Sequence, residues 1–120
     1  MTDYRYFETL ERDGVQIIYL ADVGTDRNAA AEQGRELLQF AAQSKPARLL
    51  VSFRAVRQLS SLVVGKLLVL VKSLKSQGGR IECCGAPEGF QEVLGMLGRS
   101  LPFDHADKSE ADVIQILRRG

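Results

Sequence analysis

The sequence has few of the residues that bind metal ions or form disulfides. It contains one histidine, His105, and two neighbouring cysteines, Cys83 and Cys84. One imidazole and two adjacent thiols make a poor tetrahedral ligand set, so we expect no metal site. Adjacent cysteines on a strand point to opposite faces and could join only through a strained ring. We therefore expect reduced, packed thiols, as in a cytoplasmic protein.

Long apolar runs and nucleotide-binding loops are also missing. No run approaches the roughly 18 apolar residues of a membrane span, and residues 1–6 lack the apolar stretch of a secretory signal. The chain has neither a P-loop nor a glycine-rich nucleotide loop. We expect no cofactor and no membrane partner, and any phosphoryl transfer to this chain would need a kinase from outside.

Acidic residues are absent from the middle of the chain. Residues 45–80 carry eight Lys or Arg and no Asp or Glu. Acids outnumber bases by eight to four in residues 1–44 and by seven to four in residues 81–120. The basic segment either faces an anionic partner or spreads its charges over several faces of the molecule.

Hydrophobic periodicity and turn residues divide the chain into nine elements. Short runs rich in aromatic and β-branched residues predict strands, and apolar residues at spacings of three and four predict helices. Asp13-Gly14 is a strong hairpin signal, and Gly78-Gly79 is a helix-ending signal. The predicted elements are strands at 4–10 and 15–20, a helix at 26–43 capped by Thr25 or Asp26, a strand at 47–53, a helix at 60–77, a strand at 80–84, a helix between Pro87 and Gly98, a strand at 101–105, and a helix at 108–118 capped by Ser109.

This order predicts an α/β fold in a single domain over residues 1–120. After the opening hairpin each strand is followed by a helix, and parallel strands need such crossovers. A chain of this length can form one core and is too short for two comfortable ones. We expect the order β-β-α-β-α-β-α-β-α, with a mostly parallel sheet, an antiparallel N-terminal hairpin and flanking helices.

The stretch that looks most like a site is the turn before the helix at 60–77. Ser60 stands where a helix N-cap is expected, and Ser61 lies one position inside the helix. A hydroxyl there lies near unsatisfied amides and the positive end of the helix dipole, which favour a phosphate. Arg54 and Arg57 on the preceding loop could pair with that phosphate. Ser61 is our candidate phosphorylation site, and an ordinary first-turn serine is the alternative.

The helix at 60–77 is more apolar than one buried stripe requires. Its inward face is expected at Val64, Leu67, Leu68, Val71 and Leu74. The side chains of Leu62, Val63 and Val69, with Lys66 among them, fall beside or beyond that face. They either widen the core or form an exposed strip that binds a partner protein or a second copy. With the two arginines of the loop, they are our partner-binding candidates.

The order of elements and the serine turn together resemble the STAS domain, the fold of anti-sigma-factor antagonists and stressosome scaffold proteins. The resemblance covers nearly the whole chain. On the family's Asp-Ser-Ser-Gly-Leu-Gly motif, Ser60 falls at the Asp, and Ser61 falls at the serine that partner kinases phosphorylate in switching members. Leu62 and Val63 replace the following Ser-Gly, and Gly65 fits the last glycine.

The resemblance implies a non-enzymatic interaction module that binds an anti-sigma factor or serine kinase and is regulated at Ser61. A scaffold that is not phosphorylated and forms an oligomeric signalling assembly is the alternative. A small enzyme using a cysteine is a third hypothesis, although no group that would orient a Cys–His pair is evident. Three of the basic residues flank strands at the end of the sheet opposite Ser60, namely Lys45, Arg48 and Arg80. This position disfavours one continuous basic surface that would bind a nucleic acid.

Overall fold

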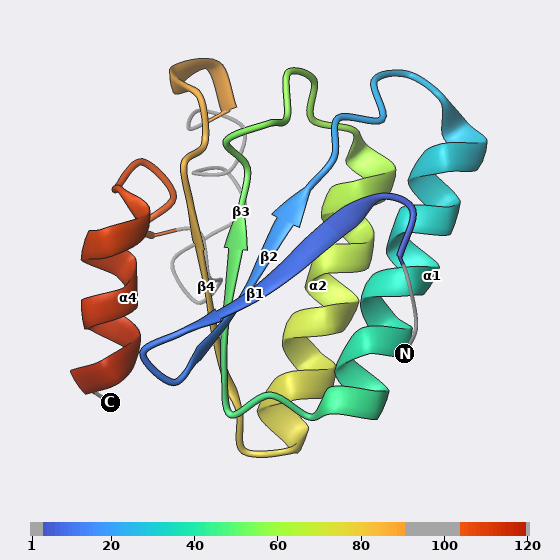
Figure 1. Ribbon diagram of the computed structural model, residues 1–120. Helices are drawn as coiled ribbons and strands as arrows, with labels where there is room; N and C mark the ends of the chain where they lie inside the picture. Colours follow the sequence, from blue (N-terminus) through green and yellow to red (C-terminus); the bar gives the residue numbers. More distant parts are fainter. Residues whose placement is uncertain (1–3, 91–103, 120) are drawn as a thin grey trace.

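The computed structural model describes residues 4–90 and 104–119, and the statements below refer to these two ranges. They form an α/β fold around a four-stranded mixed sheet (Figure 1). The strands are β1 (Phe7–Arg12), β2 (Val15–Leu20), β3 (Arg48–Ser52) and β4 (Arg80–Cys84), and the helices are α1 (Arg27–Ser44), α2 (Ser61–Ser76) and α4 (Glu110–Arg119).

The sheet has the strand order β1-β2-β3-β4, with β1 antiparallel to β2 and the other pairs parallel. The predicted hairpin, parallel strands and flanking helices are thereby confirmed. Of the helix predicted between Pro87 and Gly98, only its start at residues 88–90 lies inside the described residues. The strand predicted at 101–105 is wrong at Asp104 and His105, which form a turn, and its other residues lie outside the described ones.

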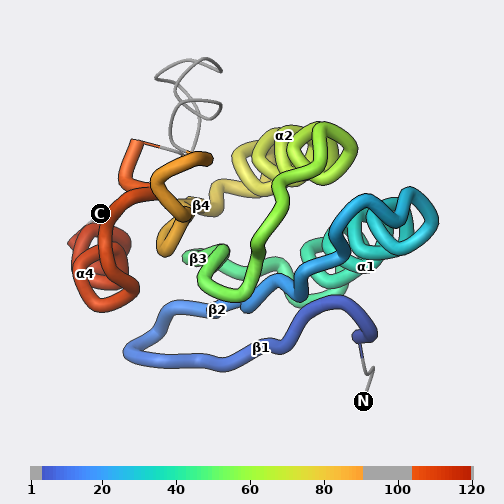
Figure 2. The backbone as a smooth tube through the Cα atoms, turned by 90° about the horizontal axis from the view of Figure 1, so that it is seen from above, coloured from blue at the N-terminus to red at the C-terminus, as the bar shows by residue number. Residues whose placement is uncertain are grey.

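Two apolar clusters lie on the two faces of the sheet. Helices α1 and α2 cover one face, and α4 covers the other (Figure 2). β3 is buried on both faces, as the continuous apolar run predicted, because Leu49 and Val51 belong to the larger cluster and Leu50 belongs to the smaller. Burial of each such side chain contributes about 1.5–3 kcal/mol. The sheet is therefore fixed from both sides.

The turns follow the local chemistry of the sequence. Asp13 and Gly14 have φ angles of 54° and 80°, the left-handed pair that a two-residue type I′ hairpin turn requires. Asp26, one of the two predicted capping residues, caps α1 by accepting a hydrogen bond from the Ala29 N–H at 3.1 Å. Gly78 has a φ of 80° after the last turn of α2, so the predicted glycine cap is confirmed.

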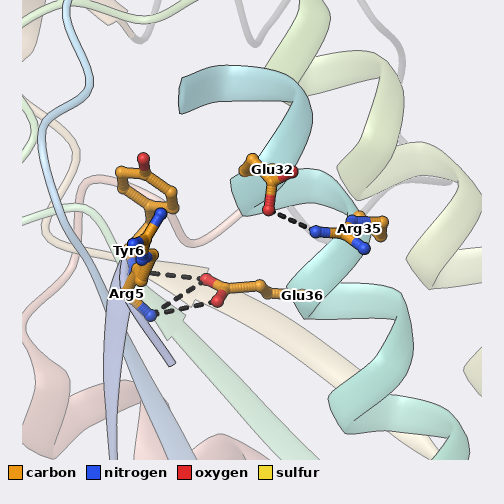
Figure 3. Close-up of polar contacts among 5 residues, drawn as sticks. All are labelled: Arg5, Tyr6, Glu32, Arg35 and Glu36. Atoms are coloured by element: carbon orange, nitrogen blue, oxygen red, sulfur yellow. Dashed lines mark hydrogen bonds and ion pairs between the residues drawn. The ribbon is translucent and has the colours of Figure 1, made fainter. Parts of the chain in front are cut away.

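Two polar side chains on the buried face of α1 bind the backbone that precedes β1. The Gln33 side-chain amide donates to the carbonyl oxygens of Tyr6 and Ala21 at 2.8 and 3.0 Å. The Glu36 carboxylate accepts from the backbone N–H of Arg5 at 3.0 and 3.2 Å and from that of Tyr6 at 3.2 Å (Figure 3). These bonds tie α1 to the backbone at the ends of β1 and β2 that meet there, and they give partners to the N–H groups of Arg5 and Tyr6 and to the Ala21 carbonyl.

None of the helices in the described ranges is both long enough and apolar enough to cross a membrane.

Candidate functional site

The serine turn lies between the end of β3 and the start of α2. Ser60 is the N-cap residue of α2: its backbone is extended, its hydroxyl oxygen accepts from the Leu62 N–H at 3.1 Å, and its carbonyl accepts from the Val64 N–H at 3.0 Å. The predicted cap is thus confirmed. Such a cap contributes about 1 kcal/mol. It also fixes the orientation of the residue that follows.

Ser61 is the first residue of α2, and its side chain is exposed. It lines an open depression of about 550 Å³ together with Arg57 and Arg27, the first residue of α1. A second, adjoining depression of about 530 Å³ is lined by Arg27, Ser60, Ser61 and Leu62. The hydroxyl of Ser61 therefore lies at the positive end of a helix, on a depression that two arginine side chains also line.

The two arginines predicted to face Ser61 lie in different places. Arg57 lines the depression as predicted. Arg54 does not fit the prediction, because its guanidinium lies 4.3 Å from the centre of the Tyr19 ring, on the side of the sheet that α4 covers. Such a cation–π contact holds the Arg54 side chain away from the serine turn.

Arg27 is a residue of the site that the sequence-based prediction missed. It lies far from Ser61 in the sequence, and no local pattern joins the two. The signal that could have found it is topological: β2 and β3 are parallel, so the helix starts that follow them meet at the same edge of the sheet.

Asp22 joins the two loops that form this edge. Its carboxylate accepts from the backbone N–H of Arg57 at 3.2 Å and of Gln58 at 3.3 Å. Partial loss of solvent opposes ionisation, but hydrogen bonds from the N–H groups of Arg57, Gln58 and Gly24 hold the pKa of Asp22 below its ordinary value. An ionised Asp22 therefore ties the loop before α1 to the serine turn.

The predicted apolar strip on α2 is only partly exposed. Leu62 and Val69 are 38% and 49% exposed, but Val63 is 4% exposed and belongs to the larger core cluster. The placement of Val63 on an exposed strip is therefore wrong. Four of the five residues predicted on the inward face of α2 are buried, namely Val64, Leu67, Val71 and Leu74, and Val63 widens that face.

Lys66, the fourth residue proposed for the strip, packs through its aliphatic stem against α1. A Cβ atom on Gly34 of α1 would lie 2.3 Å from the Lys66 Cγ, so the absence of a side chain at Gly34 allows this contact. Half of the candidate strip thus packs within the molecule, and Leu62 and Val69 remain as its exposed apolar residues.

The two cysteines are free and buried, on opposite faces of β4. Burial raises the pKa of the Cys83 thiol well above its ordinary value, and burial likewise raises the pKa of Cys84 to about 11. A thiolate is the reactive form of cysteine, so neither residue is suited to nucleophilic catalysis. In the described part of the chain, no three His, Cys, Asp or Glu side chains are grouped so as to hold a metal ion.

This burial predicts the outcome of thiol labelling. The native protein treated with N-ethylmaleimide at neutral pH should show no added mass, because both sulfurs are inaccessible and protonated. The denatured protein should gain two adducts in the same mass measurement, which is the control. Rapid modification of Cys83 or Cys84 in the native protein would contradict the packing role and reopen the enzyme hypothesis.

The arrangement of strands and helices is the fold of the anti-sigma factor antagonists. One from Mycobacterium paratuberculosis is 18% identical, covers 93% of this chain and 92% of its own, and has a TM-score of 0.72. TM1081 of Thermotoga maritima is 16% identical, covers 100% of this chain and 94% of its own, and has a TM-score of 0.76.

A third structure, the Bacillus cell fate determinant SpoIIAA in its phosphorylated form, is 17% identical, covers 93% of this chain and 99% of its own, and has a TM-score of 0.70. No protein-family model matches the chain, and a search of curated proteins finds no match. At these identities the likeness is one of fold, and the STAS-like fold predicted from the sequence is confirmed.

Proposed function

We propose that this chain is a non-enzymatic, cytoplasmic interaction module that binds a serine kinase or anti-sigma factor at the serine turn, with Ser61 as the phosphoacceptor. Residues 1–120 act as one domain in this proposal. The observation that carries it is the exposed Ser61 hydroxyl at the start of α2, beside Arg27 and Arg57, in a fold that is also that of a protein solved in a phosphorylated form.

The electrostatics of the turn suit a phosphate on Ser61. The first-turn amides of α2 and the positive end of its dipole favour an anion at this place. A phosphate adds about −1.5 to −2 charges and three acceptor oxygens, which guanidinium groups bind strongly. Arg27 and Arg57 would supply those groups from two different loops. Phosphorylation would thus change both the charge and the shape of the surface offered to a partner.

The prediction is that Ser61→Ala abolishes phosphate incorporation. The experiment incubates the protein with ATP and a purified serine kinase of the anti-sigma-factor class, and measures the added phosphate by intact mass and by peptide mapping. Ser76→Ala, which removes another exposed serine hydroxyl at the far end of the same helix, is the matched control and should be phosphorylated like the original protein. Phosphate found elsewhere, or none under conditions where the kinase is active, would contradict the proposal.

An unphosphorylated scaffold is the second candidate function. It is favoured by Leu62, next to the serine turn, and Val69, two turns further along α2. Both are exposed apolar side chains with no role in the core that would explain them. A scaffold would bind its partner equally well with or without the Ser61→Ala substitution and would lose binding with Val69→Glu. The phosphoacceptor proposal expects binding to change when Ser61 is modified.

A further inference from the structure

The outer edge of β1 is unpaired in the described sheet. β1 has one neighbour, β2, and stands at the end of the strand order. Figure 2 shows β1 as the outermost element on its side of the described chain. Five of its six residues are exposed, among them Leu10 at 42%. Edge strands in soluble proteins are usually protected by charged side chains, above all lysine, or by proline, a bulge or a covering segment.

Within the described ranges, β1 has only the first of those protections, in Glu8, Glu11 and Arg12, and these charges are of both signs. Its sequence, Phe-Glu-Thr-Leu-Glu-Arg, contains no proline and no lysine. Its pairing with β2 runs without interruption from Phe7↔Leu20 to Arg12↔Val15, so there is no bulge. The strand is therefore regular enough to accept another strand along its free edge.

The hydrogen-bond pattern shows which groups face that edge. The Tyr6 carbonyl accepts from the N–H of Ala21, the residue after β2, at 2.9 Å, so the backbone carbonyl at position 6 points toward the β2 side. Hydrogen-bonded and non-hydrogen-bonded pairs alternate along an antiparallel ladder. The even positions 8, 10 and 12 therefore also bond to β2. Backbone N–H and C=O groups at the odd positions 7, 9 and 11 point outward.

Few registers satisfy this alternation when β1 pairs with β1 of a second copy about a two-fold axis. The outward backbone groups lie at odd positions, so an odd position of one copy must pair with an odd position of the other. This requires the two-fold axis to pass through a residue and not between two residues. Centred on Glu11, the pairing would oppose two like charges, and centred on Thr9 it would oppose Leu10 to Glu8. Centred on Leu10, it places Leu10 against Leu10, and Glu8 against Arg12 of the second copy.

We propose that two copies of this chain associate through β1, in the antiparallel register centred on Leu10, to form a continuous eight-stranded sheet. Two symmetric Glu8–Arg12 pairs flank the apolar contact, and Thr9 pairs with Glu11 of the second copy through the outward backbone groups. Arg12 already donates to Glu110 at 2.8 Å, but its side chain is 52% exposed and its guanidinium has further donors. The interface uses no residue of the serine turn, so it does not depend on the function proposed above.

Charge reversal tests the register. Sedimentation equilibrium over a range of concentrations should show a monomer–dimer equilibrium for the original protein. Glu8→Arg and Arg12→Glu should each raise the dissociation constant roughly tenfold or more, because each places like charges opposite one another twice per dimer. The double variant restores opposite charges and should return the dissociation constant toward the original value. A purely monomeric original protein, or a double variant no tighter than the single ones, would overturn the proposal.

A cysteine at the two-fold axis provides an independent test. Leu10 and its symmetry mate would form a non-hydrogen-bonded pair with Cα atoms about 4.5 Å apart, within the range that a disulfide can bridge. Leu10→Cys should therefore oxidise rapidly to a covalent dimer, whereas Val69→Cys, similarly exposed on α2, should not. The buried Cys83 and Cys84 do not interfere. Equal rates of crosslinking for the two variants would also overturn the proposal.

Discussion

Replacing Glu36 by alanine is expected to lower the free energy of unfolding by about 2–3 kcal/mol, because it removes a charged acceptor that binds two backbone donors at once. Glu36 is 9% exposed, and its two oxygens accept from the N–H groups of Arg5 and Tyr6. Without it the two donors at the partly buried start of β1 lose their charged acceptor, and the carboxylate no longer joins α1 to this segment. Urea unfolding followed by circular dichroism would measure the loss.

The same helix offers a matched control for Glu36. Glu32 lies one turn earlier, and its carboxylate pairs with Arg35 at the surface, as Figure 3 shows. Because exposed ion pairs contribute little, Glu32→Ala should change the free energy of unfolding by less than about 0.5 kcal/mol. Equal losses for the two variants would mean that Glu36 acts through general charge or helix propensity and not through the backbone it binds.

Val63→Glu is expected to destabilise the fold by about 3–5 kcal/mol, because it places an unpaired carboxylate in the core. Val63 is 4% exposed and packs in the cluster between the sheet and helices α1 and α2. Typical domains have only about 5–15 kcal/mol of stability in total, so this variant should lose a large part of its stability. Thermal unfolding would show the shift directly.

Val69→Glu is the control for that prediction on the same helix. Val69 is 49% exposed, and a glutamate there would stand three residues from both Lys66 and Lys72. Helical pairs at this spacing are weakly favourable, so the free energy of unfolding should change by less than about 0.5 kcal/mol. A folded Val69→Glu variant can then be used in binding experiments. If Val63→Glu were as stable as Val69→Glu, the orientation of α2 described above would be incorrect.

Local sequence patterns predicted most of the described fold. Asp13-Gly14 fixed the hairpin through its backbone conformation, and the apolar run at 47–53 predicted β3, because a strand covered on both faces needs apolar residues on both. The cap at Ser60 followed from the preference of hydroxyl side chains for that position. Each of these signals depends only on residues close to one another in the sequence.

The predictions that failed depend on long-range packing. The inward face of α2 was predicted correctly at four residues, but its width, and with it the burial of Val63, is set by contact with α1 and the sheet. Arg54 is held on the far side of the sheet by Tyr19, and Arg27 reaches the serine turn only because two parallel strands end together. Glu36 binds backbone groups some 30 residues away. A periodic pattern within one segment of the sequence carries no information about such distant contacts.

The bonds from Asp22 to the serine turn affect how a partner could bind. The Asp22 carboxylate accepts hydrogen bonds from the backbone N–H groups of Arg57 and Gln58 and so restricts the conformation of the serine turn. The turn therefore loses conformational entropy when the chain folds and not when a partner binds. Binding to such a preorganised surface has a smaller entropic cost than binding to a mobile loop. The residue that most affects the affinity of a partner could then be one that the partner never touches.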